Sequence, residues 1–206
     1  MPSPGIRGFI VMIHSRIPAL VFSIAGALAA RACGQPSADH DAIGIYFTIA
    51  DHCTCADMAA FFQDPAYLVI TSPTRPVASF ACRLRVEPAS GYFGSWTADA
   101  AWFNAAVPPV FDCSPVGDPI TGDDIVLASI NFLVVNDTIA HLFYIDPPEG
   151  EDEVAYTDPD GEPTALTRYS GLYPGNADAI VNPHPGCWCY IANEPLSWSS
   201  IKTLYR

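Results

Sequence analysis

The feature that most limits the fold of this chain is the alternation of apolar and polar side chains along residues 77–86. A period of two is typical of a β-strand with one buried face and one wet face. The apolar face of this strand carries Ala78, Phe80, Cys82, Leu84 and Val86, and the polar face carries Ser79, Arg83 and Arg85. The 20 prolines and 14 glycines are spread throughout the chain and do not suit long helices. Together these patterns predict a mainly β fold of short strands.

Other β-rich runs lie between turn residues along the chain. They predict strands at 43–48, 67–71, 125–135 and 139–145, and weaker strands at 101–107, 163–169, 179–182 and 188–192. The tight connection Asn136-Asp137-Thr138 predicts that the two runs on either side of it pair as a β-hairpin. Several short strands with turns between them predict a single antiparallel β-sandwich, which we place at residues 35–194.

Two segments break the β pattern. Residues 55–63 have a helix-forming composition that ends before Asp64-Pro65, which predicts a short helix after the first strand. In the tail, 195–206, Ser197 can cap a helical turn while Leu196 and Ile201 form a hydrophobic staple. We expect this tail to pack on the domain as a short C-terminal helix. A sorting or partner-docking signal is the alternative.

The start of the chain is typical of an export leader. An apolar run at 17–30 follows a short basic stretch and ends at small residues, so residues 1–34 are interpreted as a signal peptide; a start at Met12 would give it an ordinary length. The run is too short to span a bilayer, so we expect no transmembrane helix in the mature chain. Secretion, extracellular or periplasmic, is the expectation. Acylation of Cys33 would instead give an envelope lipoprotein, although Arg31 suits that signal poorly.

The exported part of the chain is strongly acidic. Residues 1–34 hold three of the nine cations and none of the 22 acidic residues, so the remaining residues carry a formal charge of −16. Such a surface repels nucleic acid and anionic lipid, which excludes nucleic acid as an expected partner. It favours solubility and is compatible with divalent cations.

Six cysteines lie beyond the leader, namely Cys53, Cys55, Cys82, Cys113, Cys187 and Cys189. Export favours disulfides, and six thiols allow 15 complete pairings. We expect Cys82 to pair with Cys53 or Cys55, closing a loop that would contribute about 3–4 kcal/mol. Three disulfides would leave no free thiol. The alternative is a zinc or copper(I) site, because a histidine accompanies each Cys-x-Cys pair, although the spacing is not that of a zinc knuckle.

Acidic turns and aromatic residues supply the candidate binding sites. Asp158, Asp160 and Glu162 could bind calcium through hard oxygen ligands, and a solvated turn is the simpler interpretation. Tyr92, Trp96 and Trp102 lie in a Gly- and Ala-rich stretch together with two phenylalanines. If exposed, they could stack on a glycan or anchor a protein partner. Burial in the core is the interpretation we favour for them.

No local catalytic motif is present, so we propose no catalytic residue from the sequence. There is no Gly-x-Ser-x-Gly elbow, no His-Glu-x-x-His and no phosphate-binding glycine loop. His141 lies in an apolar strand and is interpreted as structural. A polysaccharide hydrolase remains the alternative, because its carboxylate pair would come from distant strands and leave no local signature.

Several short motifs carry a resemblance to known proteins. The runs Gly-Ile-Tyr-Phe, Tyr-Leu-Val-Ile and Val-Ala-Ser-Phe-Ala-Cys-Arg-Leu resemble those of uncharacterised exported bacterial proteins. Members of that group end in Trp-x-x-(Ile/Val)-Lys-x-Leu-(Tyr/Phe)-Arg, matched here from Trp198 to Arg206. More remotely, the strands at 77–86 and 125–135 are similar to those of cohesin and carbohydrate-binding sandwiches. That resemblance implies non-catalytic binding of a protein domain or a glycan, and it transfers no site residue. A structural role outside the cell is the other non-catalytic expectation.

Overall fold

The computed structural model describes residues 40–168, 173–184 and 186–187. The leader, Cys33, Cys189 and the tail lie outside these residues, and so does the expected C-terminal helix. All described residues belong to one compact unit, Arg31–Arg206. They form two β-sheets, and the only helical element among them is a single 3₁₀ turn, Pro174–Asn176. Within this part of the chain, no helix is long and apolar enough to cross a membrane.

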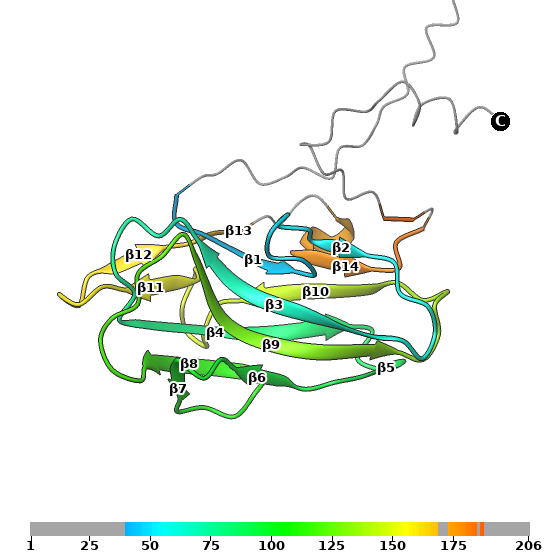
Figure 1. Ribbon diagram of the computed structural model, residues 1–206, viewed down its shortest axis with the longest axis horizontal. Helices are drawn as coiled ribbons and strands as arrows, with labels where there is room; N and C mark the ends of the chain where they lie inside the picture. Colours follow the sequence, from blue (N-terminus) through cyan, green and yellow to red (C-terminus); the bar gives the residue numbers. More distant parts are fainter. Residues whose placement is uncertain (1–39, 169–172, 185, 188–206) are drawn as a thin grey trace, which may run out of the picture. The chain divides into compact units, whose positions relative to one another are not determined.

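The first sheet has six strands and is nearly all antiparallel. Its order is β13-β1-β3-β9-β5, and β6 also pairs with β9. Only β1 and β13 pair in parallel. The longest pairing is that of β3 with β9, which runs through the centre of the sheet (Figure 1). The strands are β1 (Ala42–Tyr46), β3 (Gln63–Thr71), β5 (Tyr92–Phe93), β6 (Trp96–Ala98), β9 (Asp124–Val134) and β13 (Thr167–Arg168).

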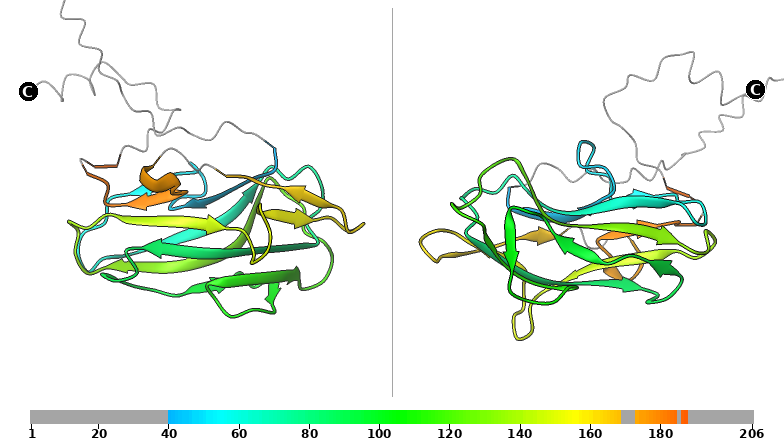
Figure 2. Two further views of the ribbon diagram at one scale, coloured as in Figure 1. Left: turned by 180° about the vertical axis from the view of Figure 1, so that it is seen from behind. Right: turned by 60° about the horizontal axis from the view of Figure 1, so that its bottom comes forward.

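The second sheet has eight strands in the order β12-β11-β4-β10-β14-β2, and β8 joins β4 to β7. Its strands are β2 (Cys55–Ala56), β4 (Ser79–Glu87), β7 (Trp102–Asn104), β8 (Val110–Pro115), β10 (His141–Asp146), β11 (Ala155–Thr157), β12 (Pro163–Ala165) and β14 (Ala179–Val181). In Figure 1, β3 and β9 lie in front of β4 and β10, and the view from behind in Figure 2 reverses this order. The sheets therefore form two layers, which bears out the expected sandwich.

The core lies between the two layers and follows from the alternation in the sequence. In β4 the side chains of Phe80, Cys82, Leu84 and Val86 are buried, and the intervening side chains are more exposed. Side chains from the first sheet meet them in the same apolar cluster, including those of β1, β3 and β9. Full burial of one such side chain stabilises the fold by about 1.5–3 kcal/mol.

Two local predictions are wrong. Residues 55–63 form no helix: Cys55 and Ala56 pair in parallel with β14, and the N–H of Met58 donates to Asn182 Oδ1 at 2.6 Å. These long-range contacts hold the start of the segment extended and outweigh its helical composition. The connection at Asn136 does turn the chain, since Asn136 Oδ1 accepts from the N–H of Thr138 at 2.9 Å. However, β9 and β10 belong to different sheets, so this turn crosses between layers and makes no hairpin.

The predicted disulfide pairing is also wrong. Cys55 is bonded to Cys187, 132 residues away, with a Cα–Cα distance of 5.8 Å, and Cys53 is disulfide-bonded as well. Cys82 and Cys113 are free and buried, so the expectation of no free thiol fails too. The strand order explains the error. Because β10 and β14 separate β4 from β2, these two strands lie about 14 Å apart at three strand spacings, and Cys82 lies at some distance along β4 from Glu87, the residue that the pairings place level with Cys55. A disulfide needs a Cα–Cα distance of about 4.4–6.8 Å.

Candidate binding surface

Exposed apolar side chains gather at two places on the described part of the molecule. One group lies where β3 begins and β9 ends, and it consists of Phe61, Phe62, Phe93 and Ile139. We call the first three the phenylalanine end. The other group lies on the β7–β8 hairpin and consists of Phe103, Val107, Val110 and Val116. The residues of the phenylalanine end are 72%, 67% and 68% exposed, which makes them the most exposed phenylalanines among the described residues.

Strand pairing holds the phenylalanine end together. Leu133 in β9 pairs with Gln63 on one side and with Phe93 on the other. Gln63 directly follows Phe62, and the N–H of Phe61 donates to the carbonyl oxygen of Val134 at 2.8 Å. The end of β9 therefore lies between Phe93 and the Phe61–Phe62 pair. Figure 1 shows β5 beside the end of β9 and the start of β3.

Phe61 has an unfavourable backbone conformation. Its φ is 65°, in the left-handed region that bulky side chains rarely adopt. Such a conformation costs on the order of 1–3 kcal/mol and clusters at functional sites. The ring is exposed, so packing in the core does not offset this cost. Phe61 is thus positioned by its backbone hydrogen bond and not by burial, which points to a role at the surface.

Ile139 lies close to the loop that precedes β5. The N–H of Val135 donates to the carbonyl oxygen of Gly91 at 2.9 Å, which ties the β9–β10 turn to that loop. Gly91 has a φ of 90°, and a Cβ atom there would lie 4.0 Å from Ile139 and 3.5 Å from the His141 ring. The close approach therefore brings a fourth exposed apolar side chain next to β5.

The aromatic residues predicted as a binding site lie largely in the core. Trp96 and Trp102 are buried, and Trp102 Nε1 donates to the carbonyl oxygen of Val126 at 2.9 Å. Tyr92 is half-buried and stacks on Phe132 with a centroid distance of 4.7 Å. This agrees with the interpretation that we favoured. The exposed rings are the residues next to them, Phe93 and Phe103, because neighbouring side chains in a strand point to opposite faces.

Sequence reasoning missed Phe61 and Phe62 as surface residues. The available signal was the pair of aromatic residues directly before Asp64-Pro65, at a place where a turn leads into a strand. We assigned them to a helix, in which one of the two rings would normally be buried. In the structure a turn holds them instead, because the N–H of Phe62 donates to the carbonyl oxygen of Ala59 at 3.1 Å.

The predicted calcium ligands lie in one turn, and the carboxylate of Asp158 in that turn is already paired with Arg75. Asp158 is buried, and its Oδ2 lies 2.5 Å from Arg75 Nη1. Its Oδ1 accepts from the backbone N–H groups of Asp160 and Glu162, both at 2.9 Å. The bond from Arg75 and these backbone donors lower the pKa of Asp158. Asp160 and Glu162 are exposed. No group of three potential metal ligands occurs among the described residues, and calcium binding stays a prediction.

The cysteine metal site is not formed by the residues that the structure describes. The disulfide between Cys55 and Cys187 leaves neither sulfur as a thiolate ligand. His52 Nε2 instead lies 2.8 Å from Asp124 Oδ1. His141 is fully buried and makes edge contacts with the stacked rings of Tyr92 and Phe132, and burial lowers its pKa, in agreement with a structural role.

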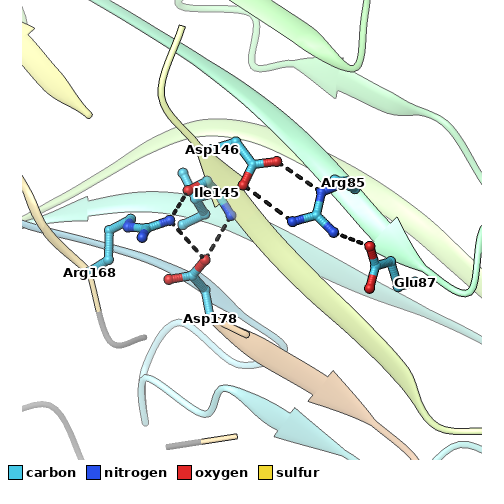
Figure 3. A network of polar contacts seen from close by, with 6 residues as sticks. All are labelled: Arg85, Glu87, Ile145, Asp146, Arg168 and Asp178. Atoms are coloured by element: carbon cyan, nitrogen blue, oxygen red, sulfur yellow. Dashed lines mark hydrogen bonds and ion pairs between the residues drawn. The ribbon is translucent and has the colours of Figure 1, made fainter. Parts of the chain in front are cut away.

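A charged network surrounds β10 (Figure 3). On one side, Arg85 Nε donates to Asp146 Oδ2 at 3.0 Å, and its Nη1 donates to Glu87. The guanidinium group also lies 3.9 Å from the ring centroid of Tyr144. These contacts are partly exposed, so we expect the ion pairs to be screened by salt and to contribute little to stability.

On the other side of β10, Asp178 is fully buried. Its Oδ2 accepts from the N–H of Ile145 at 2.7 Å and lies 3.7 Å from Arg168 Nη1. Arg168 also donates to the carbonyl oxygen of Ile145, so a residue of the six-stranded sheet contacts the eight-stranded sheet. Burial raises the pKa of Asp178 to about 6. A raised carboxyl pKa is also typical of a general acid. However, a fully buried carboxyl group cannot touch a substrate, so Asp178 links the two sheets.

Comparison with known proteins finds remote structural similarity only. No family model matches the chain, and no curated protein matches it. Solved structures that resemble it include the solution structure of CaCohA2 from Clostridium acetobutylicum, with 10% identity over 74% of this chain and 98% of that one and a TM-score of 0.44. A cohesin module of a family 33 glycoside hydrolase from Clostridium perfringens gives 12% identity over 61% and 90% and a TM-score of 0.43. A chain of the CaDoc0917(R16D)–CaCohA2 complex has 12% sequence identity over 61% of this chain and 98% of its own length, with a TM-score of 0.42.

These three structures match the remote likeness to cohesins that the strands suggested. At TM-scores below 0.5 they say nothing about what this chain binds. The similarity to exported bacterial proteins with a Trp-to-Arg tail stays a prediction. The function therefore has to be inferred from this chain's own residues.

Proposed function

We propose that this protein is a secreted, disulfide-stabilised β-sandwich that acts as a non-catalytic binding module through the phenylalanine end. The observation that supports this most strongly is the exposure of three phenylalanine rings on neighbouring segments. Exposed aromatic side chains on a rigid support are common anchors of binding surfaces, since they bury much apolar area with little loss of side-chain entropy. The strained backbone of Phe61 supports the same site.

A binding role accounts for the charged residues better than hydrolysis does. A polysaccharide hydrolase would need two carboxyl groups facing an accessible substrate. The carboxyl group whose pKa burial raises to about 6, that of Asp178, is fully buried and bonded to the backbone of β10. Asp158 is held by Arg75 and by backbone donors. We therefore propose that the protein is not an enzyme.

Secretion is proposed from the leader and is supported by the disulfide between Cys55 and Cys187, because disulfides persist mainly in oxidising compartments. The mass of the mature protein tests the mode of export. Simple cleavage near residue 34 predicts an unmodified N-terminus. An acylated Cys33 would instead identify an envelope lipoprotein.

Binding itself can be tested with a screen of glycans and of bacterial cell surfaces, using the oxidised protein with calcium and with a chelator. We expect the double variant F61S/F62S to lose at least about tenfold in affinity for any ligand found, because these rings would be central anchors. The variant F103S is the matched control, since Phe103 is 63% exposed but lies on the β7–β8 hairpin. Equal binding by wild type and F61S/F62S would contradict the proposed site.

A further inference from the structure

We infer that the phenylalanine end takes a protein segment whose apolar side chains are flanked by lysine or arginine. This inference rests on the proposed function and names the class of partner. It follows from two properties of the same surface: the apolar chemistry of its exposed rings and the sign of the uncompensated charges around them.

The exposed rings carry no polar atom. Phe61, Phe62 and Phe93 offer flat hydrocarbon faces, and Ile139 adds an aliphatic side chain beside them. Glycan sites usually combine a ring that stacks on the sugar with several polar groups that bond its hydroxyls. An apolar surface with exposed rings on both sides of a strand end instead suits the hydrophobic core of a protein interface.

The charges next to these rings are negative. Asp64 lies two residues after Phe62, and Asp137 lies two residues before Ile139; both are exposed. Neither carboxylate forms an ion pair with a described residue. The nearest cation along β4, Arg85, is already bonded to Asp146 and Glu87. Two uncompensated carboxylates therefore lie within two residues of exposed apolar side chains of this surface.

Charge also argues against a second copy of this chain as the occupant. The whole chain has a formal charge of −13, so two copies repel each other at long range. A partner with cations around its apolar residues would instead be attracted, and the carboxylates would fix its register at the rim of the contact. The structure thus favours a basic, apolar protein segment over self-association.

The test uses three fluorescent synthetic peptides and the oxidised, exported protein. The first has a short Leu/Val core with two lysines on each side, the second has the same core with glutamates, and the third has the lysines around a Ser/Gly core. Binding is followed by fluorescence anisotropy at low and at physiological salt. We expect the first peptide to bind at least about tenfold more tightly than either of the others, with an affinity that falls as salt rises.

Variants of the protein then test whether the first peptide binds at the phenylalanine end. F61S/F62S should weaken the first peptide by at least about tenfold, and D64N/D137N should weaken it less and reduce its salt dependence. F103S should bind like wild type. All substituted side chains are exposed, and thermal melts establish that each variant folds. Equal binding of the lysine- and glutamate-flanked peptides, or an equal loss in F103S, would overturn the inference.

These binding experiments distinguish a wrong class of partner from a wrong proposed function. If no peptide binds but a glycan binds in a way that needs Phe61 and Phe62, the class of partner is wrong and the binding module stands. If F61S/F62S changes neither glycan, cell-surface nor peptide binding, the proposed function fails as well.

Discussion

Among single residues, Asp178 has the surroundings that most directly predict a measurable effect. The pKa of Asp178 is raised to about 6, mainly by burial and to a smaller extent by the charge of Asp146. The hydrogen bond from the N–H of Ile145 and the charges of Arg168 and Arg85 act in the opposite direction. The folded protein therefore binds a proton at this site more tightly than the unfolded chain does. The stability that this site contributes is fully present below about pH 4 and is lost as pH rises to about 6.

The variant D178N tests this dependence. The free energy of unfolding, measured with urea between pH 4 and pH 7, should fall for wild type relative to D178N by up to about 3 kcal/mol as pH rises. Asp41 and Asp158 have lowered pKa values, so their stabilising effect is lost only as pH falls below about 4 and lies outside this window. A constant difference between wild type and D178N across the range would contradict the buried, proton-binding carboxyl group.

At the scale of elements, β2 is held mainly by its connection to β14. The strand has two residues, and it pairs with Ile180 and Val181 while Cys55 is bonded to Cys187. The disulfide closes a loop of 132 residues, which corresponds to about 5 kcal/mol in the chain-entropy estimate. The double variant C55S/C187S should therefore lose a large part of its unfolding free energy. An unchanged urea midpoint would contradict the expectation that this disulfide stabilises the fold by lowering the conformational entropy of the unfolded chain.

The strands β4 and β8 bring two thiols into the core. Burial raises the pKa of Cys82 far above its ordinary value and that of Cys113 to about 11, so neither forms a reactive thiolate near neutral pH. The oxidised protein should gain two reactive thiols on denaturation relative to the variant C82A/C113A, and none in its native state. Fast reaction of the native protein with a thiol reagent, removed by this double variant, would contradict the burial of these side chains.

Elements also show where sequence reasoning succeeds. The alternation around Phe80 and Leu84 depends only on which side chains are apolar, and the structure keeps it. The pairing of β9 was mispredicted because a turn at Asn136 has the same local chemistry whether the chain stays in one sheet or crosses to the other. Disulfide pairing failed for a related reason. It depends on strand order, and no local pattern around Cys82 encodes that order.

At the scale of the whole molecule, the two-layer architecture was predictable, and the exposed position of the three phenylalanines was not. Composition shows how many aromatic residues the chain has, but strand register decides which of them are buried and which are exposed. Tyr92 and Phe93 are adjacent in sequence, and pairing with β9 places the first against Phe132 and leaves the second exposed. The exposed position of Phe61 depends on a backbone bond to Val134, a residue more than 70 positions away.

The most direct test of the central claim is a ¹⁹F NMR titration of the oxidised protein labelled with 4-fluorophenylalanine. Single substitutions assign the signals of Phe61, Phe62, Phe93 and Phe103 among the nine phenylalanines that follow residue 34. On addition of the lysine-flanked apolar peptide, the resonances of Phe61, Phe62 and Phe93 should shift in a saturable manner, and that of Phe103 should stay in place. Shifts confined to Phe103, with none at the other three positions, would contradict the claim that the phenylalanine end is the binding surface.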